Sequence, residues 1–177
     1  KGAPMPAEQE YDQADEPTID PWRYHTTDTG NAERLVAQHG ADLRYCHPWQ
    51  KWLVWDGRRW QEDAQAAVKH RAKLTALNIY KEAAAVTEGT DAAQAKRKDL
   101  SSWARKSEQR SVRESMISLA QSEPGIPVLP AGLDQDPWLL NVENGTLDLR
   151  TGELRPHRRE DLITKLAPVA YDPTAEA

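Results

Sequence analysis

The sequence predicts an α+β fold: a small N-terminal helix and β-hairpin, then a central three-helix bundle, then a C-terminal antiparallel β-meander. Residues 62–121 contain no proline and a single glycine, and their apolar residues recur at helical spacing. Asp56-Gly57 separates two apolar runs, which is a strong signal for a hairpin. Two further turn dipeptides, Asn144-Gly145 and Thr151-Gly152, divide a later apolar stretch and indicate the meander.

Residues 1–25 are predicted to be an acidic, proline-rich arm or linker in front of a domain that spans residues 26–175. The arm combines four prolines with several acids and little apolar content, which is typical of a segment without a core of its own. The alternative is an arm pinned to a groove by its larger side chains, Tyr11, Ile19, Trp22 and Tyr24. Because the first residue is Lys1 rather than methionine, we expect a piece of a longer protein.

The composition bounds the class of protein. A chain of 177 residues suffices for one domain of ordinary size. Its single cysteine, Cys46, excludes an internal disulfide and a cysteine-cluster zinc site, and its five histidines are scattered without ligand spacing. No window approaches the roughly 20 apolar residues that span a bilayer, and no signal peptide is recognisable. We therefore expect a cytoplasmic protein without a membrane partner.

The charges are distributed unevenly along the chain. Residues 1–30 hold seven acids and two basic residues, residues 51–113 hold 14 basic residues and eight acids, and residues 114–177 hold five and 11. The basic middle of the chain could face phosphate groups, or it could dock on the acidic remainder.

The N-terminal elements are a helix and a hairpin. Capping side chains at 26–31 predict a helix over about 30–39, which Gly40 can end. A two-residue Asp-Gly loop would pair Trp55 with Arg58 and Leu53 with Trp60. One face of the hairpin would then hold Leu53, Trp55 and Trp60, and the other would hold Trp52, Val54 and Arg59.

The middle of the chain is predicted to form three amphipathic helices within about 62–121. Val68, Ala72, Ala76 and Ile79 follow helical spacing in the first. Gly89-Thr90 interrupts the pattern, and Thr90 can cap the second helix, while Ser107 can cap the third.

The meander is predicted over about 138–166. Two-residue turns would pair Val142 with Leu147, Leu140 with Leu149, and Leu149 with Leu154, so that all five apolar residues share one face. The opposite face would carry Asn141, Asp148 and Arg155 in one row. Asp161–Leu166 could add a fourth strand.

Motifs of catalysis are absent from the sequence. It contains no Gly-x-x-x-x-Gly-Lys-Ser/Thr loop, no His-Glu-x-x-His and no Gly-x-Ser-x-Gly. Asp134 and Asp136 could hold a divalent cation, but acids before a strand commonly serve as turn and capping residues. Asn141 facing Asp148 could be a site, although a hydrogen-bonded structural pair is the commoner arrangement. No metal or cofactor is predicted for these residues.

The helical middle carries the candidates for nucleic-acid binding. Such cations could follow a phosphate backbone with a steep dependence on salt, or they could simply form solvated helix faces. Trp55, Trp60 and Trp103 could stack on bases, although two of them lie on apolar faces. The ten candidates are Lys69, Arg71, Lys73, Lys96, Arg97, Lys98, Arg105, Lys106, Arg110 and Arg113.

The run Trp138–Leu154, with its Asn-Gly-Thr-Leu-Asp-Leu-Arg-Thr-Gly core, resembles the domain just upstream of the superfamily-III helicase motor. Such domains occur in phage and plasmid primase–helicases and in the poxvirus primase–helicase. The stretches 27–32, 55–60, 161–165 and 171–175 are similar to that family too. The residues that we expect to be structural within the resemblance are Asp56, Gly57, Asn141, Asn144, Gly145, Asp148, Arg150 and Gly152.

The resemblance implies a replication protein and brings no catalytic residues, because the family's ATP-binding and primer-synthesis motifs lie in flanking domains. A parent protein would be expected to use ATP and Mg²⁺. The leading hypothesis is a non-catalytic connector that couples primase to helicase, contacts single-stranded or forked DNA and helps subunits form a homo-oligomer. The alternatives are a pure oligomerisation module without DNA contact and a small metal-dependent hydrolase using Asp134, Asp136 and Asp148.

Overall fold

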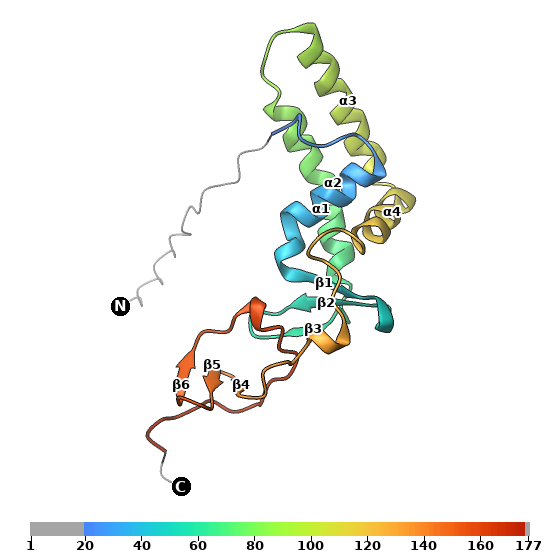
Figure 1. The fold of residues 1–177 in the computed structure, drawn as a ribbon. Coiled ribbons are helices and arrows are strands. Elements are labelled where there is room, and N and C mark those ends of the chain that lie inside the picture. Colours follow the sequence, from blue (N-terminus) through green and yellow to red (C-terminus); the bar gives the residue numbers. More distant parts are fainter. Residues whose placement is uncertain (1–19, 176–177) are drawn as a thin grey trace, which may run out of the picture.

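A computed structural model describes residues 20–175, and its elements confirm the predicted α+β fold (Figure 1). Most of the predicted acidic arm, residues 1–19, lies outside the described residues. Within them the helices are α1 (Asp28–His39), α2 (Ala67–Ala85), α3 (Asp91–Ser107) and α4 (Arg110–Ala120). The strands are β1 (Leu43–Cys46), β2 (Lys51–Trp55), β3 (Trp60–Glu62), β4 (Leu139–Val142), β5 (Gly145–Asp148) and β6 (Glu153–Arg155).

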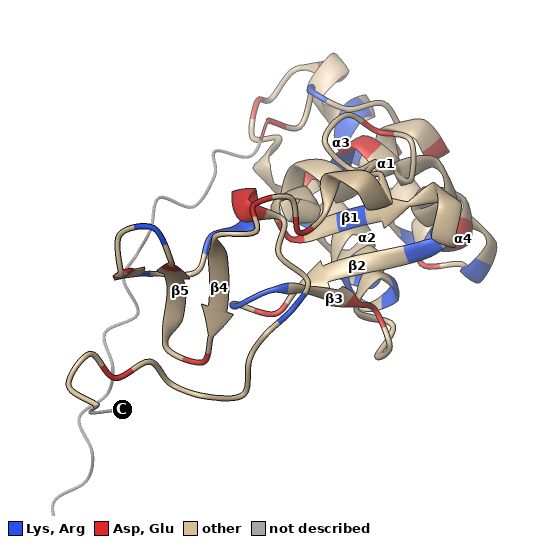
Figure 2. Cartoon of the chain, turned by 60° about the horizontal axis from the view of Figure 1, so that its bottom comes forward, with Lys and Arg blue, Asp and Glu red and all other residues tan. Residues whose placement is uncertain are grey.

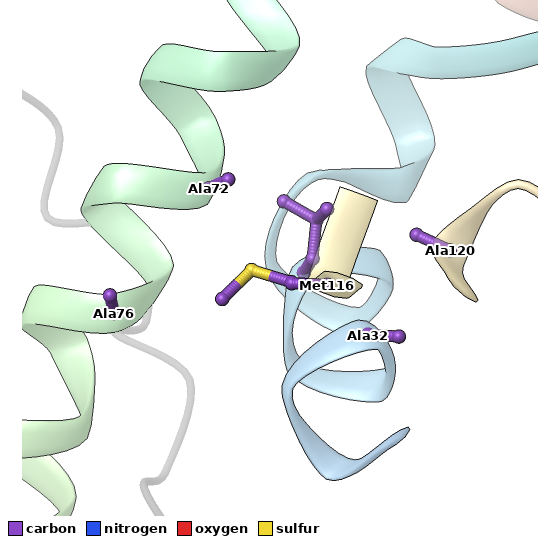
Figure 3. Packing of buried hydrophobic residues seen from close by; sticks show 6 residues of the cluster. Ala32, Ala72, Ala76, Met116 and Ala120 are labelled. Carbon is purple, nitrogen blue, oxygen red and sulfur yellow. The ribbon is translucent and has the colours of Figure 1, made fainter. Parts of the chain in front are cut away.

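Helix α2 is the centre of the helical half. Its N-terminal half packs Ala72 and Ala76 against α1 and α4, and Met116 of α4 reaches into the space between α1 and α2 (Figure 3). Its C-terminal half packs Ile79 and Ala83 against α3, so that α2 and α3 form a helical hairpin. The helical half therefore contains α1 in addition to the predicted bundle. Alanines at these positions let the helices approach closely.

The helix ends follow local capping chemistry. Thr27 Oγ1 accepts a hydrogen bond from Gly30 N at 3.0 Å, and Thr90 Oγ1 accepts one from Ala93 N at 3.2 Å, so both predicted caps are confirmed. The prediction that Ser107 caps the third helix is wrong. Ser107 is the buried last residue of α3 and accepts from Asn31 Nδ2, and Gln109 precedes α4 instead.

The first sheet has three strands in the order β1-β2-β3, one more than the predicted hairpin. Its register differs by two residues from the prediction, because Trp55 pairs with Trp60. The loop has four residues: Asp56 Oδ1 accepts from Arg58 N and from Arg59 N, both at 2.8 Å, which widens the turn. A register shift of two residues leaves each side chain on its predicted face of the sheet, so Leu53 and Trp60 share one buried cluster as expected. Arg59, predicted to lie on the other face, belongs to the loop.

The second sheet, β4-β5-β6, is the predicted meander, with both strand pairings shifted by two residues from the prediction. Val142 pairs with Gly145, and Leu147 with both Leu140 and Leu154. Because Gly145 belongs to β5, the turn lies at Glu143-Asn144. The predicted apposition of Asn141 and Asp148 is therefore wrong.

Residues 156–171 join the two sheets without forming the predicted fourth strand. Leu162 has a φ of 50°, in the left-handed region, which breaks the extended run after a 3-10 turn at Arg159–Asp161. The segment then makes a few backbone hydrogen bonds to both sheets. Trp60 N donates to Ile163 O at 2.8 Å in the first sheet, and Ala167 N donates to Asn141 O at 2.9 Å in the second.

A buried ion pair ties α1 to α2 and to the segment before α1. The Arg34 side chain is fully buried and donates from Nε and Nη2 to the Glu82 carboxylate at 2.8–3.0 Å. Its Nη1 also donates to the carbonyl oxygen of His25 at 2.7 Å, so residues just before α1 are held on the helical half. Within residues 20–175, no helix is long and apolar enough to cross a membrane.

Candidate nucleic-acid interface

The structure divides the ten basic candidates between structural contacts and open surface. Arg71 donates to the carbonyl oxygen of Asp42 at 2.9 Å, and Arg97 donates to the carbonyl oxygen of Val86 at 2.6 Å from Nη2, at the end of α2. Both guanidinium groups are therefore engaged with the backbone. The contacts of Arg97 satisfy a carbonyl that the helix leaves without a partner.

On α4, the two candidate arginines are also partly committed. Arg110 donates to Glu114 at 2.7 Å one turn later, and this hydrogen bond raises the pKa of Arg110. Arg113 is half-buried, and its Nε has no hydrogen-bond partner among the described residues. An exposed pair between neighbouring turns is weak, so Arg110 remains accessible to another anion.

Four candidates extend into solvent without a hydrogen bond or ion pair to another described residue. They lie on exposed positions of α2 and α3, and Figure 2 colours the lysines and arginines of the chain blue. These residues are Lys69, Lys73, Lys98 and Arg105.

The remaining two candidates face aromatic rings on one side of α3. Lys96 Nζ lies 5.5 Å from the centroid of Trp22, and Lys106 Nζ lies 4.9 Å from the centroid of Trp103. Trp22 is 52% exposed, so its ring offers a face to solvent as well as to the lysine. The spacing 96, 103 and 106 places these side chains on one helix face.

Arg23 extends this surface, with its guanidinium 5.1 Å from the ring centroid of Tyr24. We call the set Trp22, Arg23, Lys96, Trp103 and Lys106 the α3 aromatic–basic surface. The orientation of the Trp103 ring is fixed by a hydrogen bond, because its Nε1 donates to Oδ1 of the buried Asn31 at 2.9 Å. Alternating cations and rings can bind phosphates and stack on bases at once.

Sequence reasoning included the two lysines and Trp103 and missed Arg23, because it assigned residues 1–25 to the arm. It considered Trp22 as an anchor for that arm, and the structure brings this ring to Lys96. Trp60, by contrast, is fully buried and has no free face for a base, while Trp55 is half-buried.

The Asn-Gly run uses its polar groups within the chain. Asn141 Nδ2 donates to Arg58 O at 2.7 Å, and Thr146 donates to Asn141 Oδ1 at 2.7 Å. Asn144 binds both backbone groups of Tyr171 at 2.9 Å, which mimics a strand pairing. The amide of Asn141 thus joins the meander to the first hairpin.

Three of the residues expected to be structural are glycines, and they are required for two different reasons, space and backbone conformation. A Cβ on Gly145 would lie 2.6 Å from the carbonyl oxygen of Arg155, so that position requires glycine for space. Gly57 and Gly152 have φ of 97° and 74°, and they require it for backbone conformation.

The three aspartates of the hydrolase alternative are engaged separately. Asp134 accepts from Thr164 N and Oγ1 at 2.7 and 2.6 Å. Asp136 and Asp148 both contact Arg150, whose hydrogen bonds hold the pKa of Asp148 below its usual value. Residues 20–175 contain no group of three or more His, Cys, Asp or Glu side chains that could hold a metal ion.

His157 is a further polar residue in the meander that sequence reasoning missed, because scattered histidines give no pattern. Its Nδ1 lies 2.9 Å from Asn141 Oδ1, and its Nε2 is buried without a partner among the described residues. It completes the network around Asn141.

The family model described as D5 N terminal like matches residues 32–177. No curated protein matches the chain.

Proposed function

Because the chain belongs to the D5 N-terminal-like family, the domain that precedes the helicase in primase–helicase proteins, we propose that it is a non-catalytic connector between a primase and a ring helicase. In this role it contacts single-stranded DNA through the α3 aromatic–basic surface. ATP and Mg²⁺ are assigned to the helicase, and the connector contributes position and charge.

The observation that carries the DNA contact is the pairing of two α3 lysines with indole rings, of which Trp22 is 52% exposed and Trp103 is half-buried. Lys96 and Lys106 each lie within 5.5 Å of an indole centroid, and neither makes an ion pair with another described residue. A surface lysine held over a ring keeps its charge available to a phosphate, and the ring can stack on a base. Lys98 and Arg105, on another exposed part of the same helix, add positive potential without fixing a register.

Fluorescence anisotropy with a labelled oligo(dT) strand tests this proposal at two or more salt concentrations. Each phosphate contact to a single strand contributes about −0.7 to the slope of log K against log salt. The double variant K96E/K106E should therefore flatten the slope by about 1.4 and weaken binding most at low salt.

The matched control is R158E/K165E, which makes the same change in net charge at exposed positions of the C-terminal segment. It should retain the wild-type slope, because the exchanged residues lie outside the proposed DNA-binding surface and do not contact phosphates there. Equal slopes for both double variants, or binding that does not respond to salt, would contradict the proposal.

A second candidate function is supported by an exposed apolar row on the meander. Trp138, Leu140 and Leu149 are 52%, 40% and 48% exposed, and Leu149 N donates to Trp138 O at 2.8 Å, so they lie at one end of the sheet. Such a row favours a protein contact, and it would suit a homo-oligomerisation module without DNA contact. Sedimentation of the chain alone separates the two: a stable oligomer that L140S/L149S dissolves, together with absent DNA binding, favours this candidate.

A further inference from the structure

A groove on the first sheet is distant from the α3 aromatic–basic surface along the chain and in the fold. Its volume is about 510 Å³, within the range of small-molecule sites. Its lining includes the buried Leu53 of β2 and Trp60 of β3, together with Trp49, Arg59 and Thr164. Figure 1 places this sheet below the helices, while α3 rises at the opposite end.

The guanidinium of Arg59 is incompletely satisfied within the groove. Nη1 makes only a long contact of 3.4 Å to the carbonyl oxygen of Thr164. Nε is buried, without a hydrogen-bond partner among the described residues, and lies 3.8 Å from Asp56 Oδ2, beyond hydrogen-bonding distance. The Arg59 side chain is 35% exposed, so an oxyanion entering the groove can accept a charge-assisted hydrogen bond from its outer nitrogens, while Nε stays covered.

The lining also offers an aromatic face. Trp49 ends a short 3-10 turn and is 47% exposed, although it is a large apolar side chain. At the rim, the ion pair between Lys51 and Glu62 neutralises the one carboxylate that lines the groove. The groove therefore presents a partly exposed guanidinium whose ion pair with Asp56 is 3.8 Å long, an aromatic ring, and the buried apolar side chains of Leu53 and Trp60.

We infer that this groove binds a nucleotide unit, with its phosphate on Arg59 and its base stacked on Trp49. A nucleotide combines the two groups that complement this lining: an anion that can accept hydrogen bonds from a guanidinium and a base that can stack on an indole. The unit can be a free nucleotide or one residue of a single strand. For the strand as the source, the inference rests on the proposed function.

The full chain labelled with 5-fluorotryptophan tests the inference by ¹⁹F NMR, with W49F assigning the resonance of Trp49. Titration with dTMP should shift this resonance saturably, while thymidine and inorganic phosphate, each carrying half of the chemistry, should shift it more weakly. R59Q should weaken dTMP binding about tenfold or more, as expected for loss of a hydrogen bond to a charged group. The control K165Q should bind as wild type does.

W49A is a second variant, because the half-exposed ring of Trp49 can be removed with little effect on the core. It should lower the affinity for dTMP, measured by calorimetry, about tenfold, as loss of one stacked base predicts. The buried Trp60 resonance reports whether R59Q still folds. An unmoved Trp49 resonance at about 10 mM dTMP, or equal affinity in R59Q, W49A and wild type, overturns the inference.

The source is identified by repeating the titration with oligo(dT) in K96E/K106E. If the groove binds a strand, oligo(dT) shifts Trp49 in the wild type at lower concentration than dTMP does. If dTMP shifts the Trp49 resonance while oligo(dT) binds nowhere, the groove binds free nucleotide. In that case the groove inference stands and the proposed DNA contact of the connector is refuted. If oligo(dT) binds α3 and leaves Trp49 unmoved, the groove proposal fails as a strand site.

Discussion

Removing the charge of Glu82 should destabilise the fold more than any other change of one carboxylate to an amide. Arg34 is fully buried and directs Nε and Nη2 at this carboxylate, whose own side chain is only 8% exposed. In E82Q the guanidinium would stay buried without a counter-charge. Breaking a buried pair in this way costs about 3–5 kcal/mol.

Urea unfolding followed by circular dichroism measures the effect. With an m-value of about 2 kcal/mol/M, the midpoint of E82Q should fall by roughly 2 M. The double variant R34M/E82L removes both charges and should recover most of the loss, because desolvation no longer opposes burial. It should remain slightly less stable than wild type, since the hydrogen bond from Arg34 to the carbonyl oxygen of His25 is lost.

The matched control is E114Q, which makes the same chemical change in the pair with Arg110, whose side chain is 86% exposed. Its midpoint should equal that of wild type. A midpoint of E82Q within the error of E114Q, or a double variant as unstable as E82Q, would refute the account of the buried pair.

Three further predictions concern pH and backbone space. Hydrogen bonds from Arg150 lower the pKa of Asp148. The stability that this carboxylate contributes is therefore present above its unfolded pKa and is lost as pH falls through the lower folded value. The free energies of unfolding of D148N and wild type should differ at pH 6 and converge at about pH 2. Burial chiefly lowers the pKa of His39, so stability should decline as pH falls below about 6.5, and H39N should flatten that decline in thermal melts. G145A should cost about 1–3 kcal/mol because its Cβ meets a backbone oxygen on β6 at 2.6 Å. G152A, in open space with a φ of 74°, should cost about 1–2 kcal/mol, and G145A melting no lower than G152A would contradict the steric argument.

The helices and the faces of both sheets could be predicted from the sequence, because both depend on periodicity. The registers could not. Turn dipeptides suggested two-residue loops, but Asp56 and Asp148 each accept a hydrogen bond from the amide two residues later, which favours four-residue loops. Each pairing was wrong by two residues, and two is the period of a strand, so the residues that share a face were still grouped correctly. Which side of the meander is buried was not predicted, because Asn141 and Thr146 are buried while Leu140 and Leu149, on the apolar face, are exposed.

The candidate surface was predictable in part. Basic residues on α3 are visible in the sequence, but which of them are available depends on partners far along the chain. Arg71 is engaged by Asp42, and Trp22 reaches Lys96 across more than 70 residues. The groove beside Arg59 depends on where Thr164 returns to the first sheet, and no local pattern encodes that position.

The hydrogen bonds of Asn141 and Asn144 have a consequence for how this kind of sequence is interpreted. Both amides satisfy the chain's own backbone, at Arg58 and Tyr171. The most recognisable motif of the chain therefore holds the meander against the first hairpin and the C-terminal segment, and it reveals little about ligands. Two proteins could share this motif and still bind different ligands, since the residues of the helix and groove surfaces lie in other parts of the sequence.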